Sequence, residues 1–214
     1  EKAWPGCVLL GAQNGKIFIH EASGYHTYDK KRSMRVSDIF DLASITKVIA
    51  TTSGIMKLYD EGLLKLKSPV VDYIPKFKGT KKEYKAIKSK ITVQDLLTHT
   101  SGLPAFRAYH LIDESLEIKI NTIYNTAPVA SPGDTMIYSD IGVIILGKIV
   151  VTISGFSLDH YVDSLIFSPL GMKTTTHNPK PEKLHRIVPT EIDDSGLLIK
   201  GVVHDENARS LDGV

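Results

Sequence analysis

Two short apolar runs near the start of the chain predict a β-hairpin. The runs Val8–Leu10 and Ile17–Ile19 flank the dipeptide Asn14-Gly15, which accepts the positive φ angles of a type I′ turn. We therefore expect two antiparallel strands within residues 7–22. The rest of the chain has mostly helical spacing, and a two-stranded sheet is marginal in water. The pattern therefore indicates that further strands are needed to complete the sheet.

Residues 43–60 have the spacing of an amphipathic helix. Apolar or small side chains recur at every third or fourth position, and Gly62 follows as a helix terminator. We expect this helix to be central and buried. The series consists of Ile45, Val48, Ile49, Thr52, Ile55, Met56 and Tyr59.

Capping residues predict where two later helices begin. Thr92 followed three residues later by Asp95 has the pattern of a capping box. Either Ser139 or Asp140 can cap a nearly all-apolar helix that runs to Gly155. A helix that is apolar on every side must be enclosed by other elements.

The bulk composition is that of a compact globular protein. Of the 214 residues, 42% are hydrophobic and 23% are charged, as in ordinary domains, and we expect residues 1–214 to form a single domain. Lys and Arg number 26 against 24 Asp and Glu. This balance does not predict a nucleic-acid partner. A Lys-rich stretch from Lys76 to Lys90 is interpreted as a solvated loop face.

Cysteine usage and hydropathy exclude two further features. The single Cys7 cannot form an internal disulfide. The longest apolar run, Ile141–Val151, is interrupted by Lys148 and is too short to span a bilayer. We therefore expect no transmembrane segment in this chain.

A serine and a lysine at the opening of the first predicted helix are candidates for chemistry. Ser44 is followed at i+3 by Lys47, which places both on one helix face. A serine hydroxyl is a weak nucleophile until a base accepts its proton, and a partly desolvated lysine amine can do so. The helix N-terminus favours negative charge that develops near Ser44. Because this spacing is common by chance, a first-turn serine and a surface lysine remain the alternative.

Three segments of the chain occur together in an order typical of one superfamily. They are Phe40–Lys47, Leu96–Leu103 and Tyr138–Asp140. With them the chain resembles the serine β-lactamase and penicillin-binding protein superfamily. The resemblance is strongest to its class C-like branch of class C β-lactamases, D-alanyl-D-alanine carboxypeptidases and related esterases. Further matching segments are Pro132-Gly133, Ile166–Met172 and Val203–Ala208.

This resemblance implies a fold, an activity and a location. The expected fold is α+β and β-lactamase-like, with an antiparallel sheet and a helical body. The expected activity is that of a serine hydrolase that forms an acyl-enzyme on Ser44. Its substrates would be peptides, amides or esters, above all D-alanyl cell-wall peptides or β-lactam-like compounds. We expect it to work outside the cytoplasm, in the periplasm or cell envelope, without a cofactor.

The resemblance also assigns roles to Tyr138 and Asp140. Tyr138 matches the tyrosine of the family's Tyr-x-Asn element, so Ser44, Lys47 and Tyr138 are the expected catalytic residues. Asp140 stands at the substrate site where many relatives have Asn. A carboxylate only accepts hydrogen bonds, so Asp140 is expected to hold Lys47 or Tyr138 and to keep Lys47 protonated. This departure puts β-lactamase activity in doubt. An alternative register places Ser139-Asp140 at the start of a Ser-x-Asn element.

Ser101, close to His99, is a second possible nucleophile. We assign both residues a structural role at a helix end, where serine, glycine and histidine satisfy backbone groups. The remaining histidines lack the spacing of metal ligands, so no metal is expected. They are His20, His26, His110, His160, His177, His185 and His204.

One element implied by the resemblance is not found in residues 1–214. It is a Lys-Thr-Gly or His-x-Gly segment on a strand, which lines the cleft and helps to build the oxyanion hole. We therefore expect an incomplete catalytic domain whose site is completed by a C-terminal segment or a complementary fragment. The alternative is a catalytically inactive binding or structural module with the same fold. The intact trio Ser44, Lys47 and Tyr138 argues against it.

Overall fold

The computed structural model describes residues 3–211, which form two compact units. One unit combines the residues up to Leu42 with Asn178–His204. The other combines Ala43–His177 with the residues from Asp205 onward. Both units can belong to one domain, so the single-domain assignment of residues 1–214 stays a prediction.

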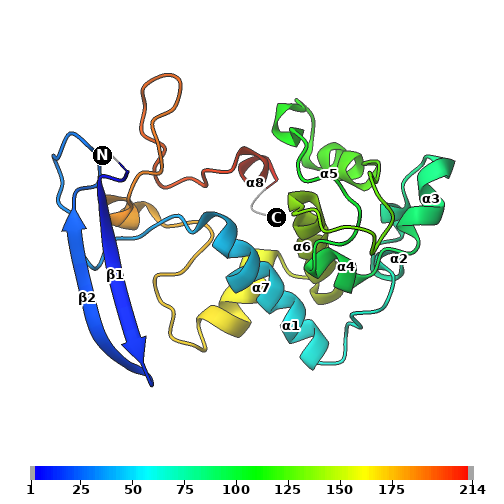
Figure 1. Ribbon diagram of the computed structural model, residues 1–214, viewed down its shortest axis with the longest axis horizontal. Helices are drawn as coiled ribbons and strands as arrows, with labels where there is room; N and C mark the ends of the chain where they lie inside the picture. The colour runs from blue at the N-terminus through cyan, green and yellow to red at the C-terminus, as the bar shows by residue number, and fades with distance from the viewer. Residues whose placement is uncertain (1–2, 212–214) are drawn as a thin grey trace. The chain divides into compact units, whose positions relative to one another are not determined.

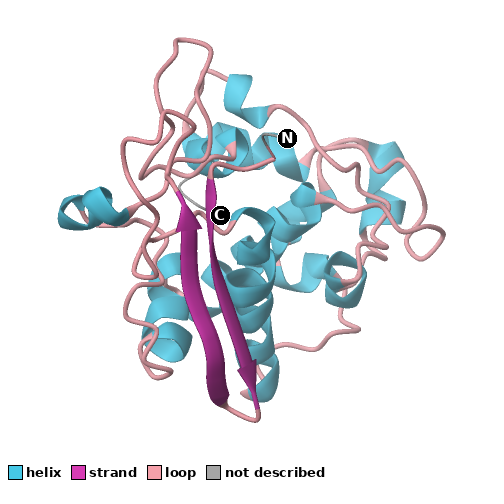
Figure 2. Cartoon of the chain, turned by 60° about the vertical axis from the view of Figure 1, so that its left-hand side comes forward, coloured by secondary structure: helices cyan, strands magenta, loops and turns pink. Residues whose placement is uncertain are grey.

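The first unit contains the predicted hairpin (Figure 2). Strand β1 (Gly6–Gln13) pairs antiparallel with β2 (Lys16–Gly24). Asn14 and Gly15 have φ angles of 52° and 74°, which are the positive values that a type I′ turn requires. The hairpin prediction is confirmed. Within residues 3–211 this pair is the whole sheet.

A buried histidine and a buried aspartate hold together the loop that follows β2. His26 Nε2 lies 2.7 Å from Asp38 Oδ2, and the two side chains are 4% and 1% exposed. The Arg35 backbone N–H donates to the same carboxylate at 2.7 Å, and an Arg32 guanidinium nitrogen lies 3.4 Å from it. Burial disfavours the charged carboxylate, but the hydrogen bonds from His26 and Arg35 and the nearby positive charges outweigh burial. Together they hold the pKa of Asp38 below its usual range.

We expect Asp38→Asn to destabilise this loop by about 1–3 kcal/mol, because buried donors would lose a charged acceptor. A carboxyl with a depressed pKa in the folded state stabilises the fold above its unfolded pKa. This stabilisation is lost as the pH falls through the folded pKa. The unfolding free energy of the parent protein should therefore fall more steeply on acidification than that of Asp38→Asn. Equal slopes in denaturant titrations over the acid range would contradict this account.

The second unit is helical, and helix α6 lies at its centre beside α4 (Figure 1). The side chains of Ile141, Ile145 and Ile149 in α6 are at most 1% exposed, so the predicted enclosure of this apolar helix is confirmed. No single helix among residues 3–211 is long and apolar enough to cross a membrane, although the bent pair of α6 and residues 158–167 passes by length and composition. The helices of this unit are α1 (Ser53–Asp60), α2 (Val70–Tyr73), α3 (Lys82–Lys88), α4 (Val93–Leu97), α5 (Leu116–Tyr124), α6 (Asp140–Ser154), α7 (Leu158–Val162) and α8 (Glu206–Ser210).

Both predicted helix caps are present. Thr92 and Asp95 form a reciprocal capping box at the start of α4. The Ser139 hydroxyl accepts the Gly142 N–H at 3.1 Å and so caps α6. Gly155 ends α6 with a φ of 74°, the left-handed conformation that glycine adopts at little cost.

The prediction that the helix over residues 43–60 is buried is wrong for one of its faces. Ala50, Ile55 and Leu58 are buried, because this side packs against α6 and α7. The opposite side is uncovered within the described residues, so its apolar members remain exposed to solvent. They are Ile45, Val48, Met56 and Tyr59.

The interpretation of Lys76–Lys90 as a solvated loop face is wrong in two respects, because the stretch contains helix α3 and because Lys88 is buried. This side chain is fully buried, and its Nζ donates to the Tyr124 carbonyl at 2.5 Å. The same nitrogen lies 4.8 Å from the centre of the Phe77 ring. Burial lowers the pKa of Lys88 to about 8. Lys88 thus closes the carbonyl end of α5 instead of facing water.

Candidate active site

The candidate nucleophile stands at the opening of a helical run with irregular geometry. Ala43 has a φ of 45°. This backbone conformation is uncommon for residues other than glycine and costs about 1–3 kcal/mol. A 3₁₀ turn spans Ala43–Ile45, and a π-helical segment Lys47–Thr52 leads into α1. Such irregular turns recur at functional sites. The exposed Ser44 therefore sits where the backbone departs from regular helix.

Lys47 joins Ser44 to Asp140. Its Nζ donates to Ser44 Oγ at 2.8 Å and lies 2.9 Å from Asp140 Oδ1. The Lys47 and Asp140 side chains are 21% and 32% exposed, so solvent screens this ion pair only in part. The geometry agrees with the expectation that Asp140 holds Lys47.

Asp140 strengthens the hold of Lys47 on its proton. Partial burial of the amine lowers its pKa, but the hydrogen bond and the negative charge of Asp140 raise it more, and Tyr138 adds to this effect. The net result is a pKa of Lys47 above its usual range. Lys47 is therefore an ammonium at neutral pH and must lose a proton before it can serve as a base.

Tyr138 lies on the same side of the site, with its ring against Lys47. The Lys47 Nζ is 5.3 Å from the ring centroid, and the tyrosine side chain is half-exposed. The structure thus brings together all four residues that the sequence predicts for the site, Ser44, Lys47, Tyr138 and Asp140. Proton transfer through the Tyr138 hydroxyl stays a prediction.

His99 fixes the segment that carries Tyr138 and Asp140. Its Nδ1 accepts the Ser139 N–H at 3.0 Å, and its ring centroid lies 4.6 Å from that of Tyr138. The Asp140 N–H in turn donates to the Ala105 carbonyl at 2.9 Å. Sequence reasoning foresaw that His99 satisfies a backbone group, but it missed that this group lies between two site residues.

Burial lowers the pKa of His99, the charge of Lys47 lowers it further, and Asp140 opposes both. The imidazole is therefore neutral at pH 7. Its Nδ1 has no proton, because it accepts the Ser139 N–H.

Ser101 does not share this site. It is buried, and its hydroxyl oxygen accepts the Leu103 N–H at 3.3 Å. The neighbouring Gly102 has a φ of 73°, and a Cβ there would come within 2.1 Å of the Ala130 carbonyl oxygen. These contacts give the segment the structural role that was expected. Among residues 3–211 no group of three or more His, Cys, Asp or Glu side chains could hold a metal ion.

The family model described as "Beta-lactamase" matches residues 1–200. The chain belongs to the β-lactamase family.

Relatives and solved structures agree with membership of the β-lactamase family. A "Putative D-alanyl-D-alanine carboxypeptidase" of Salmonella heidelberg (strain SL476) is 32% identical over 98% of this chain and 52% of its own length. The octameric penicillin-binding protein homologue from Pyrococcus abyssi is 27% identical, with a TM-score of 0.74 over 92% of this chain and 46% of that one. A class C β-lactamase from Rhodobacter sphaeroides shares the fold, with 22% identity and a TM-score of 0.73 over 94% of this chain and 55% of that one.

These matches confirm the predicted α+β fold of the β-lactamase family. The chain spans about half the length of the curated relatives that it matches.

His99 offers a test of how this β-lactamase-family site is held in place. In the full-length protein, His99→Ala should lower the acylation rate about tenfold to a hundredfold, because Tyr138 and Asp140 would lose their anchor. His99→Asn should recover most of the rate, since its amide oxygen can accept the Ser139 N–H and Asn tolerates the φ of 58° at this position.

The pH profile separates this positioning role from a general loss of stability. Protonation of Nδ1 breaks the bond from Ser139, so the parent rate should fall at a pH below the ordinary histidine pKa. The Asn variant should lack that fall. A His99→Asn variant that is as slow as His99→Ala and keeps the pH profile of the parent would show that the bond from Ser139 does not position the site.

Proposed function

We propose that the protein is a serine hydrolase that forms an acyl-enzyme on Ser44. The observation that supports this most directly is the position of the Lys47 amine, 2.8 Å from Ser44 Oγ and 2.9 Å from Asp140, at the opening of a helix. A serine paired with a titratable group at the start of a helix suits nucleophilic acyl transfer.

The proposed reaction begins when one proton leaves the pair formed by Lys47 and Tyr138. That proton passes to solvent, so that the pair can accept another. Ser44 Oγ then attacks the substrate carbonyl while the pair takes the hydroxyl proton. Collapse of the tetrahedral intermediate breaks the bond to the leaving amine or alcohol, which receives that proton. Water hydrolyses the resulting ester and regenerates Ser44.

The substrates that fit this proposal best are peptides that end in D-alanine. The relative from Salmonella heidelberg carries the name of a D-alanyl-D-alanine carboxypeptidase. The Asp140 carboxylate cannot donate to a substrate carbonyl, and it is already engaged with Lys47. This weighs against β-lactams, whose amide carbonyl would meet no donor at Asp140. With such substrates, we propose that the protein works outside the cytoplasm, in the periplasm or cell envelope.

A substrate panel with the full-length protein tests the proposal. Release of D-alanine from a D-alanyl-D-alanine peptide should exceed turnover of a chromogenic cephalosporin, and both should vanish in Ser44→Ala. Ester turnover without D-alanine release would identify an esterase instead. A folded protein that turns over neither the peptide, nor the cephalosporin, nor a short-chain nitrophenyl ester would favour the inactive module.

A further inference from the structure

Positive charge is concentrated in one stretch of the helical unit. Residues 62–90 contain nine lysines and two carboxylates, a net charge of +7, whereas the whole chain carries +2. All other residues together therefore carry −5. A chain that is nearly neutral as a whole thus has one strongly cationic part.

Eight of the nine lysines are exposed, and Lys88 is the buried exception. None of the eight has a carboxylate within ion-pair distance in the described part of the chain. Of the two local acids, Glu83 is engaged with the Tyr84 hydroxyl. We call these eight side chains the lysine surface. They are Lys65, Lys67, Lys76, Lys78, Lys81, Lys82, Lys85 and Lys90.

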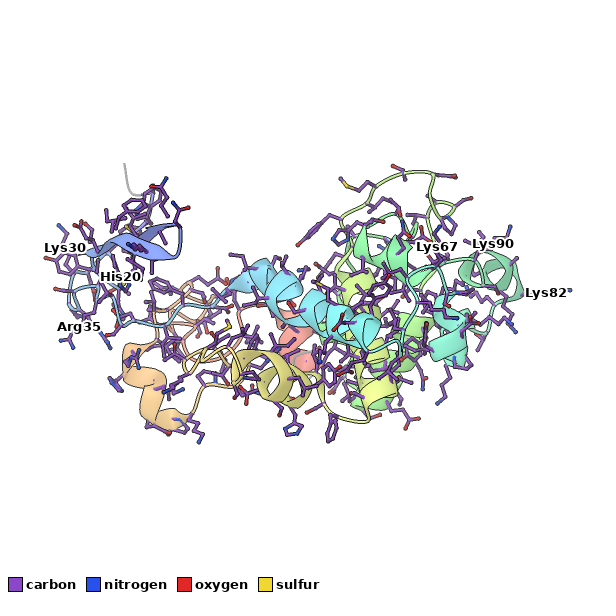
Figure 3. All side chains as sticks on the ribbon, turned by 90° about the horizontal axis from the view of Figure 1, so that it is seen from below. His20, Lys30, Arg35, Lys67, Lys82 and Lys90 are labelled. Atoms are coloured by element: carbon purple, nitrogen blue, oxygen red, sulfur yellow. The ribbon has the colours of Figure 1, made fainter. Side chains whose placement is uncertain are left out.

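The lysine surface comes from segments that pack together. The Val70 N–H donates to the Ile91 carbonyl at 2.8 Å, which places the segments of Lys67 and Lys90 side by side. Figure 3 shows both lysines, with Lys82 farther along, on the α3 end of the helical unit. The positive charges of these lysines therefore lie at one end of the helical unit.

Within residues 3–211 no ion pair offsets the charge of these eight lysines. Lysines at i and i+3 or i+4, as around α3, repel each other, and dissolved salt screens this repulsion more strongly as its concentration rises. No arginine lies between Arg35 and Arg107. The surface therefore lacks the planar guanidinium groups that bind single phosphates in a fixed geometry. Lysine ammonium groups act as point charges that suit a diffuse array of negative charge.

We propose that the lysine surface docks the protein reversibly on an anionic lipid bilayer, through the phosphate headgroups. Clusters of four to eight basic residues bind such surfaces by charge alone. Attraction by charge alone gives weak, salt-sensitive attachment. Nucleic acid fits less well, because recognition of bases uses arginine and stacking aromatic side chains, and the only tyrosines of this stretch, Tyr73 and Tyr84, are not fully exposed.

Vesicle sedimentation with the full-length protein tests this docking. The protein should bind vesicles of phosphatidylglycerol and phosphatidylcholine, not vesicles of phosphatidylcholine alone, and should detach between about 0.05 M and 0.5 M salt. Each lysine contributes about a fivefold factor near an anionic surface. The combined variant K78Q, K81Q, K82Q and K85Q should therefore bind about a hundredfold more weakly or worse.

The matched control removes the same charge from the other unit, through K16Q, K30Q, R35Q and K180Q, all at exposed positions. It should bind within about threefold of the parent protein. A second variant of the lysine surface, K65Q, K67Q and K90Q, should repeat the loss, so the result does not depend on the folding of one variant. Ser44→Ala should bind normally, which separates this proposal from the proposed hydrolase.

Three results would overturn the proposal. The first is equal weakening by the lysine-surface variant and the control variant, which would mean that only net charge matters. The second is no binding to phosphatidylglycerol vesicles at low salt. The third is tighter binding to duplex DNA than to the vesicles at the same salt, which would assign the surface to a nucleic acid.

Discussion

Lys47→Ala in the full-length protein is expected to slow acylation of Ser44 about a thousandfold, the scale of a lost general acid–base group. The alanine removes the atom that lies 2.8 Å from Ser44 Oγ, and with it a route for the hydroxyl proton. Single-turnover kinetics with a chromogenic ester measure this step directly. The loss should appear in the acylation rate more than in substrate binding.

Lys57→Ala is the matched control, because Lys57 stands on the same helical run. Its ammonium lies 3.0 Å from Glu61, one turn away, and exposed pairs of this kind contribute little to stability. The control should keep the parent acylation rate. A Lys47→Ala protein that is folded and acylates as fast as Lys57→Ala would exclude Lys47 from the mechanism.

Asp140→Asn is expected to raise the acylation rate by β-lactams at neutral pH about tenfold or more. The aspartate raises the pKa of Lys47, and each unit by which that pKa falls gives about ten times more neutral amine. The amide also restores a donor that a β-lactam carbonyl can use. The rise of the rate with pH should therefore shift to lower pH in the variant.

Asp134→Asn provides the control for this prediction, since it removes one carboxylate from the turn that precedes Tyr138. It should leave both the rate and the pH profile unchanged. Two results would show that Asp140 does not control the pKa of Lys47. One is acylation of Asp140→Asn no faster than that of the parent, and the other is a pH–rate profile of the variant that is not shifted from that of the parent.

Local patterns predicted the elements whose causes are local. The Asn14-Gly15 turn follows from backbone preferences of two adjacent residues, and the capping box of Thr92 and Asp95 needs only a spacing of three. The pairing of Ser44 with Lys47 is local in the same sense, because i+3 places both on one helix face. These features could be foreseen without knowledge of the tertiary fold.

Features that depend on distant segments were not predictable from periodicity. His99 contacts the backbone of a residue 40 positions away, and nothing in its own neighbourhood indicates that partner. Lys88 is buried because the Tyr124 carbonyl, 36 residues later, accepts its ammonium. The uncovered face of the helix over residues 43–60 has apolar spacing on both sides, so sequence alone could not tell which side packs.

The most direct test of the account is intact-mass analysis of the full-length protein after exposure to a fluorophosphonate. We predict one adduct per molecule, located on Ser44 by peptide mapping and absent from Ser44→Ala. A short ester should acylate the same serine. Undiminished labelling of Ser44→Ala, or an adduct mapped to Ser101, would contradict the assignment of Ser44 as the nucleophile.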